Sequence, residues 1–265
     1  MLLQEASPRG MEKFIEAAGL DWSLHIRDVA PEMLSERGRS GKKGGRGRPR
    51  SVALAGRGGP ARNTEVFPNA PLPEKVMAAT VQLDGVDTTV ATYHAPTGGR
   101  HKLKKPAQAV QLARWLALVE GPVVLGGDFN TPKVDPPDQG GIRTHWHSGD
   151  DKLNGLPGDD LLVGPEPVHG LEDVLRRYLV DHPDDLDLIR ADRPDGPLMT
   201  SYCTGGAGKR RYRYDAIWVS SHFTVESVEY VYDEAIDAGT DHALVLAGLA
   251  VRSSRFMNLT RGPVR

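Results

Sequence analysis

A carboxylate and an amide follow an apolar run in the middle of the chain. Asp128 and Asn130 come after Val123–Leu125 and two glycines, which permit a sharp turn of the backbone. Side chains two positions apart in an extended chain share a face, so we expect Asp128 and Asn130 to lie together and Phe129 to enter the core. Carboxylate and amide oxygens suit a hard cation and a phosphate oxygen. Asp and Asn are also common turn residues, so this pattern alone fits a plain turn equally well.

A second carboxylate stands next to an imidazole near the end of the chain. Asp241 and His242 precede Ala243–Leu246, an apolar run that we expect to be a core strand. The carboxylate can bind a metal ion while the histidine takes or gives a proton. A solvated Asp–His pair is the alternative interpretation of this dipeptide.

A third carboxylate, Asp215, interrupts the otherwise apolar strand expected over residues 212–219. A charge in such a strand needs a partner. The functional interpretation is that Asp215 fixes the tautomer of His242, as a third group orients the base in other hydrolases. The alternative is an ion pair with Arg211 or Arg213.

Glu5 and His94 each end a strand-like run. Glu5 follows Met1–Gln4, and His94 follows Val90–Tyr93. Taken singly, a histidine at a strand end is usually a hydrogen-bonded turn residue and a glutamate there is usually on the surface.

Taken together, these residues resemble the endonuclease/exonuclease/phosphatase family, the superfamily of deoxyribonuclease I and the apurinic endonucleases. The resemblance spans almost the whole chain and rests on Leu3-Gln4-Glu5, Tyr93-His94, Gly127-Asp128-Phe129-Asn130, Tyr214-Asp215-Ala216-Ile217 and Thr240-Asp241-His242.

This resemblance implies a metal site that binds Mg²⁺ or Mn²⁺. Glu5 is then the principal ligand, with Asp241 near the same ion or a second one. Asp128 and Asn130 belong to the same set and also position the attacking water and the phosphate.

The resemblance also implies roles for two histidines. His242, paired with Asp215, is the acid/base or charge-stabilising group. His94 matches a position that contacts the scissile phosphate or donates a proton.

The sequence departs from the family pattern in two places. Thr240 replaces a serine, and the family normally has a further strand before the one that ends in Glu5. A missing central strand leaves backbone groups unpaired. We therefore expect a late-assigned start, a fragment, or an exposed sheet edge at which the protein associates with another chain.

The elements that must position these residues can be read from apolar spacing, caps and turns. Many strands with few helices, and the family resemblance, predict an α+β fold in which two mainly antiparallel sheets pack face to face between outer helices, a four-layer α/β/β/α sandwich in one domain over residues 1–265. Ser7, Pro8 and Gly19 predict a helix over residues 8–18, and Asp84-Gly85 predicts a hairpin. Further expected elements are strands at 22–28, 51–55, 75–83, 86–93, 122–125, 212–219, 223–232 and 243–251, a helix that starts at Pro106 and a helix at 171–179.

Two segments lack the pattern of a packed element. Residues 37–50 are Gly-rich and basic, so we expect a flexible loop in which Arg46, Arg48 and Arg50 bind a nucleic-acid backbone; a solubilising insertion is the alternative. Residues 131–170 form a long connection that should overhang the site. Its potential zinc ligands lack tetrahedral spacing and are not favoured: His145, His147, Asp150 and Asp151.

Composition excludes some classes of protein. There are 33 Lys and Arg residues against 35 acidic residues, a net charge of -2, so any attraction to nucleic acid must be local. Cys203 is the single cysteine and cannot form an internal disulfide, which suits the cytosol. No run approaches the roughly 20 apolar residues of a membrane span, and we expect a cytoplasmic protein.

The function that we expect is metal-dependent hydrolysis of a phosphodiester, with nucleic acid as the first-choice substrate. A phosphomonoesterase or a lipid-headgroup phosphodiesterase remains open, because such enzymes differ mainly in their loops. A catalytically inactive binding protein on the same scaffold also remains open.

Overall fold

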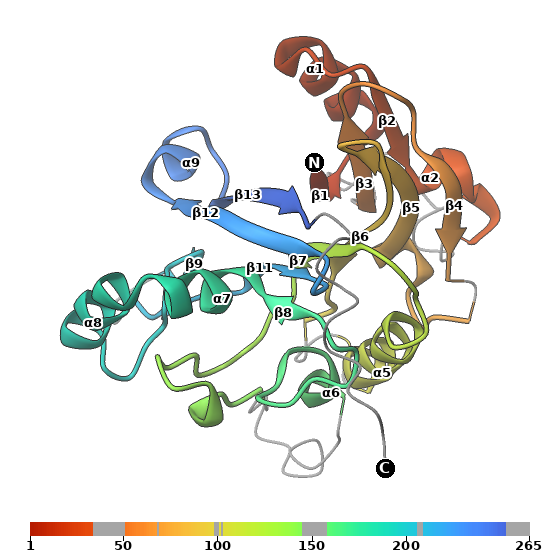
Figure 1. Ribbon diagram of the computed structural model, residues 1–265. Helices are drawn as coiled ribbons and strands as arrows, with labels where there is room; N and C mark the ends of the chain where they lie inside the picture. The colour runs from red at the N-terminus through yellow and green to blue at the C-terminus, as the bar shows by residue number, and fades with distance from the viewer. Residues whose placement is uncertain are drawn as a thin grey trace, which may run out of the picture.

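The computed structural model describes residues 1–33, 51–67, 69–97, 101, 103–144, 158–205 and 209–252 (Figure 1). The strands are β1 (Leu2–Ala6), β2 (Trp22–His25), β3 (Ser51–Gly56), β4 (Arg62–Val66), β5 (Val76–Leu83), β6 (Val86–His94), β7 (Val123–Asp128), β8 (Glu172–Asp173), β9 (Tyr202–Cys203), β10 (Arg211–Tyr212), β11 (Asp215–Val219), β12 (Phe223–Val231) and β13 (Leu244–Val251). The α-helices are α1 (Pro8–Ala18), α2 (Ile26–Val29), α5 (Lys104–Leu116), α6 (Asp159–Val163), α7 (Val174–Asp181), α8 (Pro183–Asp192) and α9 (Asp233–Asp237). Short 3₁₀ turns are η1 (Pro31–Met33), η2 (Pro73–Lys75) and η3 (Gln139–Gly141).

The largest sheet has six strands in the order β4-β5-β6-β7-β11-β8. Its pairs are antiparallel except for β6 and β7, which run parallel. A parallel pair needs a long crossover, and α5 lies in the connection between these two strands. The sheet is therefore mixed.

The second β layer consists of two separate pieces, β1-β3-β2 and β12-β13. Leu54 of β3 and Phe223 of β12 belong to one buried cluster with Met77 and Val124 of the large sheet, so both pieces cover the same face of it. Figure 1 shows them side by side above the six-stranded sheet.

Helices cover the two outer faces. Met11 of α1 packs on Ala53 and Ala55 of β3, while Leu112 of α5 packs in a cluster with Leu125 of the large sheet. The order of layers is therefore α1, small sheet, large sheet, α5, which confirms the expected sandwich.

Two local predictions are confirmed by backbone geometry. The Ser7 hydroxyl accepts a hydrogen bond from the Gly10 amide at the start of α1, and Gly19 ends the helix with φ of 59°. Asp84 and Gly85 both have positive φ between β5 and β6, as a tight hairpin requires.

Two expected elements have different bounds. The strand expected at 22–28 ends at His25, because the His25 side chain accepts a hydrogen bond from the Arg27 amide and begins α2. The helix expected at 171–179 begins at Val174, because residues 172–173 pair with β11 as β8. Asp173 then caps α7 by accepting a hydrogen bond from the Arg176 amide.

Other differences follow from polar contacts and turns. The strand expected over 212–219 is divided into β10 and β11, because Arg213 between them turns into a buried ion-pair network. Helix α5 begins before Pro106, which lies in its first turn. Helix α8 was not expected, although Pro183 at its start is a typical signal.

The buried ion-pair network surrounds Arg213. Its guanidinium donates to Asp135 at 2.6 Å and to Asp173 at 2.7 Å, and Arg176 also contacts Asp135. Burial alone would raise the pKa of Asp135, but the two arginines lower it. The network fixes the segment after Asn130 against α7. Because Arg213 has these partners, an ion pair with Arg213 is not the role of Asp215.

We predict that Arg213→Leu lowers the free energy of unfolding by roughly 3–5 kcal/mol, since it leaves the buried Asp173 without its guanidinium and Asp135 with Arg176 alone. Urea denaturation measures this loss. Arg190→Leu is the matched control: Arg190 and Asp187 form a pair with side chains 54% and 71% exposed, and the expected change is below about 1 kcal/mol. Equal effects of the two substitutions would contradict the prediction.

Candidate active site

Three polar residues lie in a row across the ends of adjacent strands. His94 of β6 pairs in register with Asp128 of β7, and Asp215 of β11 pairs with Asp128 from the other side. Residues that are directly opposite in a sheet present their side chains on the same face. The sheet itself therefore brings together three residues that are far apart in the sequence.

Gly126 and Gly127 allow other strands to approach β7. A Cβ atom on Gly127 would lie 1.8 Å from the Tyr93 carbonyl oxygen of β6, and one on Gly126 would lie 2.5 Å from Leu2 of β1. The expected sharp turn at these glycines is wrong: both lie within β7, and neither has positive φ. Gly127 is needed because a side chain there would meet the β6 backbone, whereas one at Gly126 would meet only the end of the Leu2 side chain.

Asn130 holds Asp128 in place. Its backbone amide donates to Asp128 Oδ1 at 2.8 Å, and its side-chain nitrogen donates to Asp128 Oδ2 at 2.9 Å and to the Ala95 carbonyl at 3.0 Å. Asn130 has φ of 49°, so a left-handed turn and not an extended chain brings the two side chains together. Phe129 is buried as predicted.

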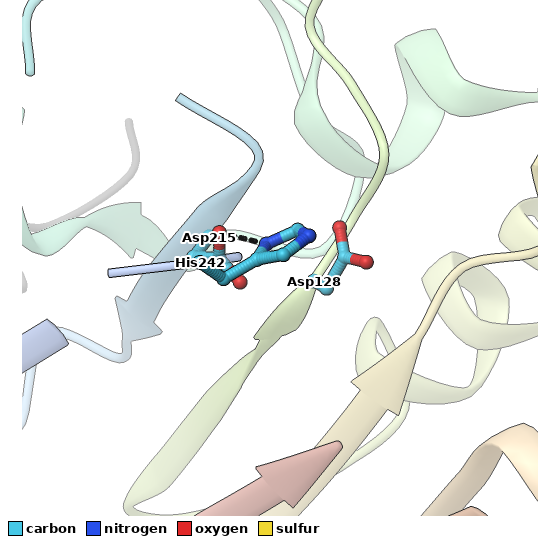
Figure 2. Close-up of side chains that lie close together, drawn as sticks. All are labelled: Asp128, Asp215 and His242. Carbon is cyan, nitrogen blue, oxygen red and sulfur yellow. Dashed lines mark hydrogen bonds and ion pairs between the residues drawn. The ribbon is translucent and has the colours of Figure 1, made fainter. Parts of the chain in front are cut away.

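His242 forms the predicted hydrogen bond with Asp215. Its Nδ1 donates to Asp215 Oδ2 at 2.8 Å, and Figure 2 shows the imidazole between the carboxylates of Asp215 and Asp128. Burial alone would lower the pKa of His242, but the hydrogen bond and charge of Asp215, with Asp128 and Asp241, raise it to about 9. The imidazole is therefore protonated at neutral pH.

The pKa of Asp128 is also raised, but for a carboxylate this disfavours the charged form. Burial and the negative charge of Asp215 raise the pKa of Asp128 to about 7, against the opposing effects of His242, the Asn130 amide and Lys105. The carboxylate is thus poised to exchange a proton near neutral pH.

His94 is a neutral hydrogen-bond donor. Burial and the charges of Lys75, His242 and His101 lower its pKa to about 3. Lys75 Nζ lies 3.0 Å from His94 Nδ1, so Nδ1 accepts and the proton is on Nε2. Nε2 faces Asp128 Oδ2 at 3.6 Å.

The buried polar groups fit a divalent cation. Asp128, Asp215 and His242 each offer one ligand atom, and these atoms lie within 4.8 Å of one another. Two carboxylates so close together favour a cation between them, and their oxygens suit Mg²⁺ or Mn²⁺. Of the four metal ligands expected from the sequence, only Asp128 belongs to this group.

Glu5 and Asp241 lie along the wall of an adjoining cleft. The cleft is about 650 Å³, and its lining comes from residues 1–5, 126–128, 215–217 and 239–247. The pairing of β1 with β3 is irregular between Leu3 and Ala6, where Glu5 has φ of 53°. Such bulges commonly re-aim a side chain beside an active site. The Glu5 and Asp241 side chains are exposed. The cleft that they line also reaches the buried carboxylates of Asp128 and Asp215.

Comparisons with known proteins place the chain in a family. A model of the endonuclease/exonuclease/phosphatase family matches residues 1–242. The chain belongs to this family. The predicted resemblance is confirmed, and members of the family hydrolyse phosphoester bonds.

Solved structures of the endonuclease/exonuclease/phosphatase family share this fold. D. rerio TDP2 complexed with a single-strand DNA product has 13% identity and a TM-score of 0.57, with 94% of this chain and 85% of that chain covered. The human Nocturnin catalytic domain with bound sulfate has 15% identity and a TM-score of 0.53, with 95% of this chain and 80% of that chain covered. At these identities the likeness shows the fold alone. Among curated proteins, none matches this sequence.

Some predicted features are not part of the described structure. Arg46, Arg48 and Arg50 lie outside the described residues, as do the potential zinc ligands between residues 145 and 151. Within the described ranges, no helix is long and apolar enough to cross a bilayer.

Three residues near the site were not anticipated. Lys75 contacts His94, and Lys105, which is buried in α5, donates to the Asn130 carbonyl at 2.6 Å. The Ser201 hydroxyl accepts hydrogen bonds from the Tyr214 and Asp215 amides at 2.9 and 3.0 Å. Neither lysine nor the serine stands in a sequence pattern that signals a site, so only the fold reveals these contacts.

We predict that the His242 imidazole of the metal-free protein titrates near pH 9, because Asp215 stabilises its charged form. NMR titration in chelator should show this midpoint. In Asp215→Asn the midpoint should fall by at least one unit, since the charge is lost while a side-chain acceptor remains. A histidine whose pKa is raised by folding stabilises the fold fully at a pH below its ordinary pKa. The contribution of His242 to stability should therefore decrease as the pH rises from that value through 9. An unchanged midpoint in Asp215→Asn would contradict the pairing.

We also predict that Gly127→Ala destabilises the protein by about 1–3 kcal/mol or more and lowers activity, because the new methyl group clashes with the β6 backbone. Thermal unfolding measures the first effect. Gly59→Ala is the control, since no atom lies within 4 Å of the place that its new methyl group would take. Wild-type stability of Gly127→Ala would show that β6 does not approach β7 so closely.

Proposed function

We propose that the protein is a divalent-metal-dependent phosphodiesterase that acts on nucleic acid. The observation that carries this proposal is the convergence of Asp128, Asp215 and His242 at a cleft that Glu5 and Asp241 also line. This combination concentrates negative charge for a cation and places a protonated imidazole next to it.

In the proposal, Glu5 and Asp241 hold the cation together with Asp128. Bound there, Mg²⁺ or Mn²⁺ would offset the negative charge of the phosphate and polarise its oxygens. Asn130 acts through its three hydrogen bonds, which keep the Asp128 carboxylate in one orientation. It positions Asp128 and need not contact the cation itself.

The side chains supply proton transfer. A water oxygen forms a bond to phosphorus while its proton passes to the Asp128 carboxylate, which is held next to His94 and His242. The phosphorus–oxygen bond to the leaving group breaks, and protonated His242 gives its proton to the departing oxygen. Asp215 stabilises the charge of His242 before this transfer. Neutral His94 donates from Nε2 to a phosphate oxygen.

Two considerations favour nucleic acid as the substrate. The cleft is open and about 650 Å³, which leaves room for more than a single phosphate group. The family also includes D. rerio TDP2, which was crystallised with a single-strand DNA product.

We predict that the protein hydrolyses bis(p-nitrophenyl) phosphate and single-stranded oligonucleotides with Mg²⁺ or Mn²⁺, and that chelator abolishes both activities. Glu5→Gln and His242→Asn should each lower kcat by roughly 10²–10⁴-fold, since each removes a group that acts on the reacting phosphate. Steady-state kinetics measures the change.

His222→Asn is the matched control. His222 contacts Ser220 at the other end of β11, so activity should stay at the wild-type level. Equal low activity in wild type, Glu5→Gln and His242→Asn would contradict the proposed enzymatic function and support an inactive binding protein. Full activity in chelator would contradict the metal dependence.

A further inference from the structure

A basic hollow lies beside the active site. It is about 380 Å³ and is lined by Lys133, Arg193, Arg210, Arg211 and Tyr212, with Val134, Gly196 and Pro197. Lys133 follows Asn130 by three residues, and Tyr212 precedes Asp215 by three residues. Two chain segments therefore lead directly from this basic hollow to the buried carboxylates.

The positive charge of the basic hollow is largely uncompensated. Arg193 pairs with Asp192 at 3.2 Å, but among the described residues Lys133, Arg210 and Arg211 have no side-chain ion pair. Asp195 lines a neighbouring hollow that shares Lys133 and Arg211 with the basic hollow, and Asp135 there is already held by Arg213. Three cations thus face solvent against a single additional acid.

Some other exposed arginines have an acidic partner instead. Arg62 pairs with Asp87 at 2.6 Å, and Arg190 pairs with Asp187 at 3.0 Å. Cations that converge on one concave surface without acidic partners attract anions.

A row of aromatic rings links the basic hollow to the active site. Tyr202 lies 4.9 Å from the His242 ring, Tyr214 lies 5.5 Å from Tyr202, and Tyr212 lies 4.8 Å from Tyr214. Tyr214 is buried, whereas Tyr202 and Tyr212 are partly exposed. The surface between His242 and the cations therefore offers aromatic side chains at its two ends.

We propose that the basic hollow and this aromatic row bind the part of a single-stranded nucleic acid that extends from the scissile phosphate. Phosphates of that part contact Lys133, Arg210 and Arg211, and an unpaired base stacks on Tyr212. The inference rests on the proposed function, because the scissile phosphate must lie at Asp128 and His242.

The chemistry of the surface selects this ligand. Guanidinium groups bind phosphate oxygens through two parallel hydrogen bonds, so two adjacent arginines suit a phosphate backbone. Stacking on an aromatic ring requires a base that is not paired, as in single strands. A small phosphate monoester such as p-nitrophenyl phosphate, bound at Asp128, is too short to reach the basic hollow.

The first test removes the three cations together. Lys133→Ala/Arg210→Ala/Arg211→Ala should weaken binding of a labelled single-stranded oligonucleotide of roughly ten residues at least tenfold, measured by fluorescence anisotropy in chelator. The slope of log affinity against log salt should fall by about 2, since three phosphate contacts are lost. Hydrolysis of bis(p-nitrophenyl) phosphate should keep its wild-type kcat and KM.

The control removes the same charge elsewhere. Lys13→Ala/Arg114→Ala/Arg252→Ala takes three exposed cations from α1, α5 and the end of β13, and it should leave affinity and salt slope near wild type. Equal losses in the two triple variants would overturn the inference in favour of a general charge effect.

The second test concerns the stacked base. Tyr212→Leu should lower affinity for the single strand roughly tenfold, whereas Tyr212→Phe should keep it, because phenylalanine retains the ring. The same substitutions should not change the weaker binding of a duplex of equal length. Tighter binding of the duplex, or no effect of Tyr212→Leu, would overturn the single-strand assignment.

Failure of the inference and failure of the proposed function are separable. If wild type cleaves the small diester but the cation variant binds the oligonucleotide as wild type does, the inference fails and the phosphodiesterase remains. If wild type cleaves no diester with any metal, the proposed function fails, and binding in chelator still decides whether the basic hollow holds a nucleic acid.

Discussion

Repulsion between Asp128 and Asp215 is the constraint around which the site is organised. The two carboxylates lie opposite each other on neighbouring strands, both buried, and the charge of Asp215 contributes to the pKa of about 7 for Asp128. Sheet hydrogen bonds prevent them from moving apart. His242 lies between them and is charged as a result, with a pKa of about 9. In the proposed function, a divalent cation would supply further positive charge beside these carboxylates.

A second pair of buried carboxylates in the same molecule has different partners. Asp135 and Asp173 are also buried carboxylates, but Arg213 contacts both of them directly and makes a stable structural network. Asp215 instead pairs with the charged His242, which can release its proton, and Asp128 faces the neutral His94. One buried acidic pair therefore holds the loop after Asn130 in place, and the other remains available for chemistry. Both depend on the segment from Arg213 to Asp215, which connects β10 to β11.

Much of this arrangement follows from sequence patterns. Local residue types predict the caps at Ser7 and Gly19 and the hairpin at Asp84-Gly85. The family pattern predicts the pairing of His242 with Asp215. Contacts that depend on long-range packing were not predictable: Lys75 against His94, Lys105 against Asn130 and Ser201 beneath Asp215 involve residues that no local pattern marks. The role of Gly127 was misread for the same reason, since close approach of a neighbouring strand cannot be distinguished from a turn in one sequence.

The backbone at Glu5 has a consequence for attempts to stabilise the protein. A glutamate with φ of 53° occupies a region that side chains disfavour, at a cost on the order of 1 kcal/mol relative to glycine. If variants of the protein were selected by melting temperature alone, glycine would therefore be favoured at this position. The selected variants would lack the carboxylate that lines the cleft. If Glu5 acts as proposed, a substitution that raises thermal stability at this residue would lower activity, so a screen for stable variants must measure both.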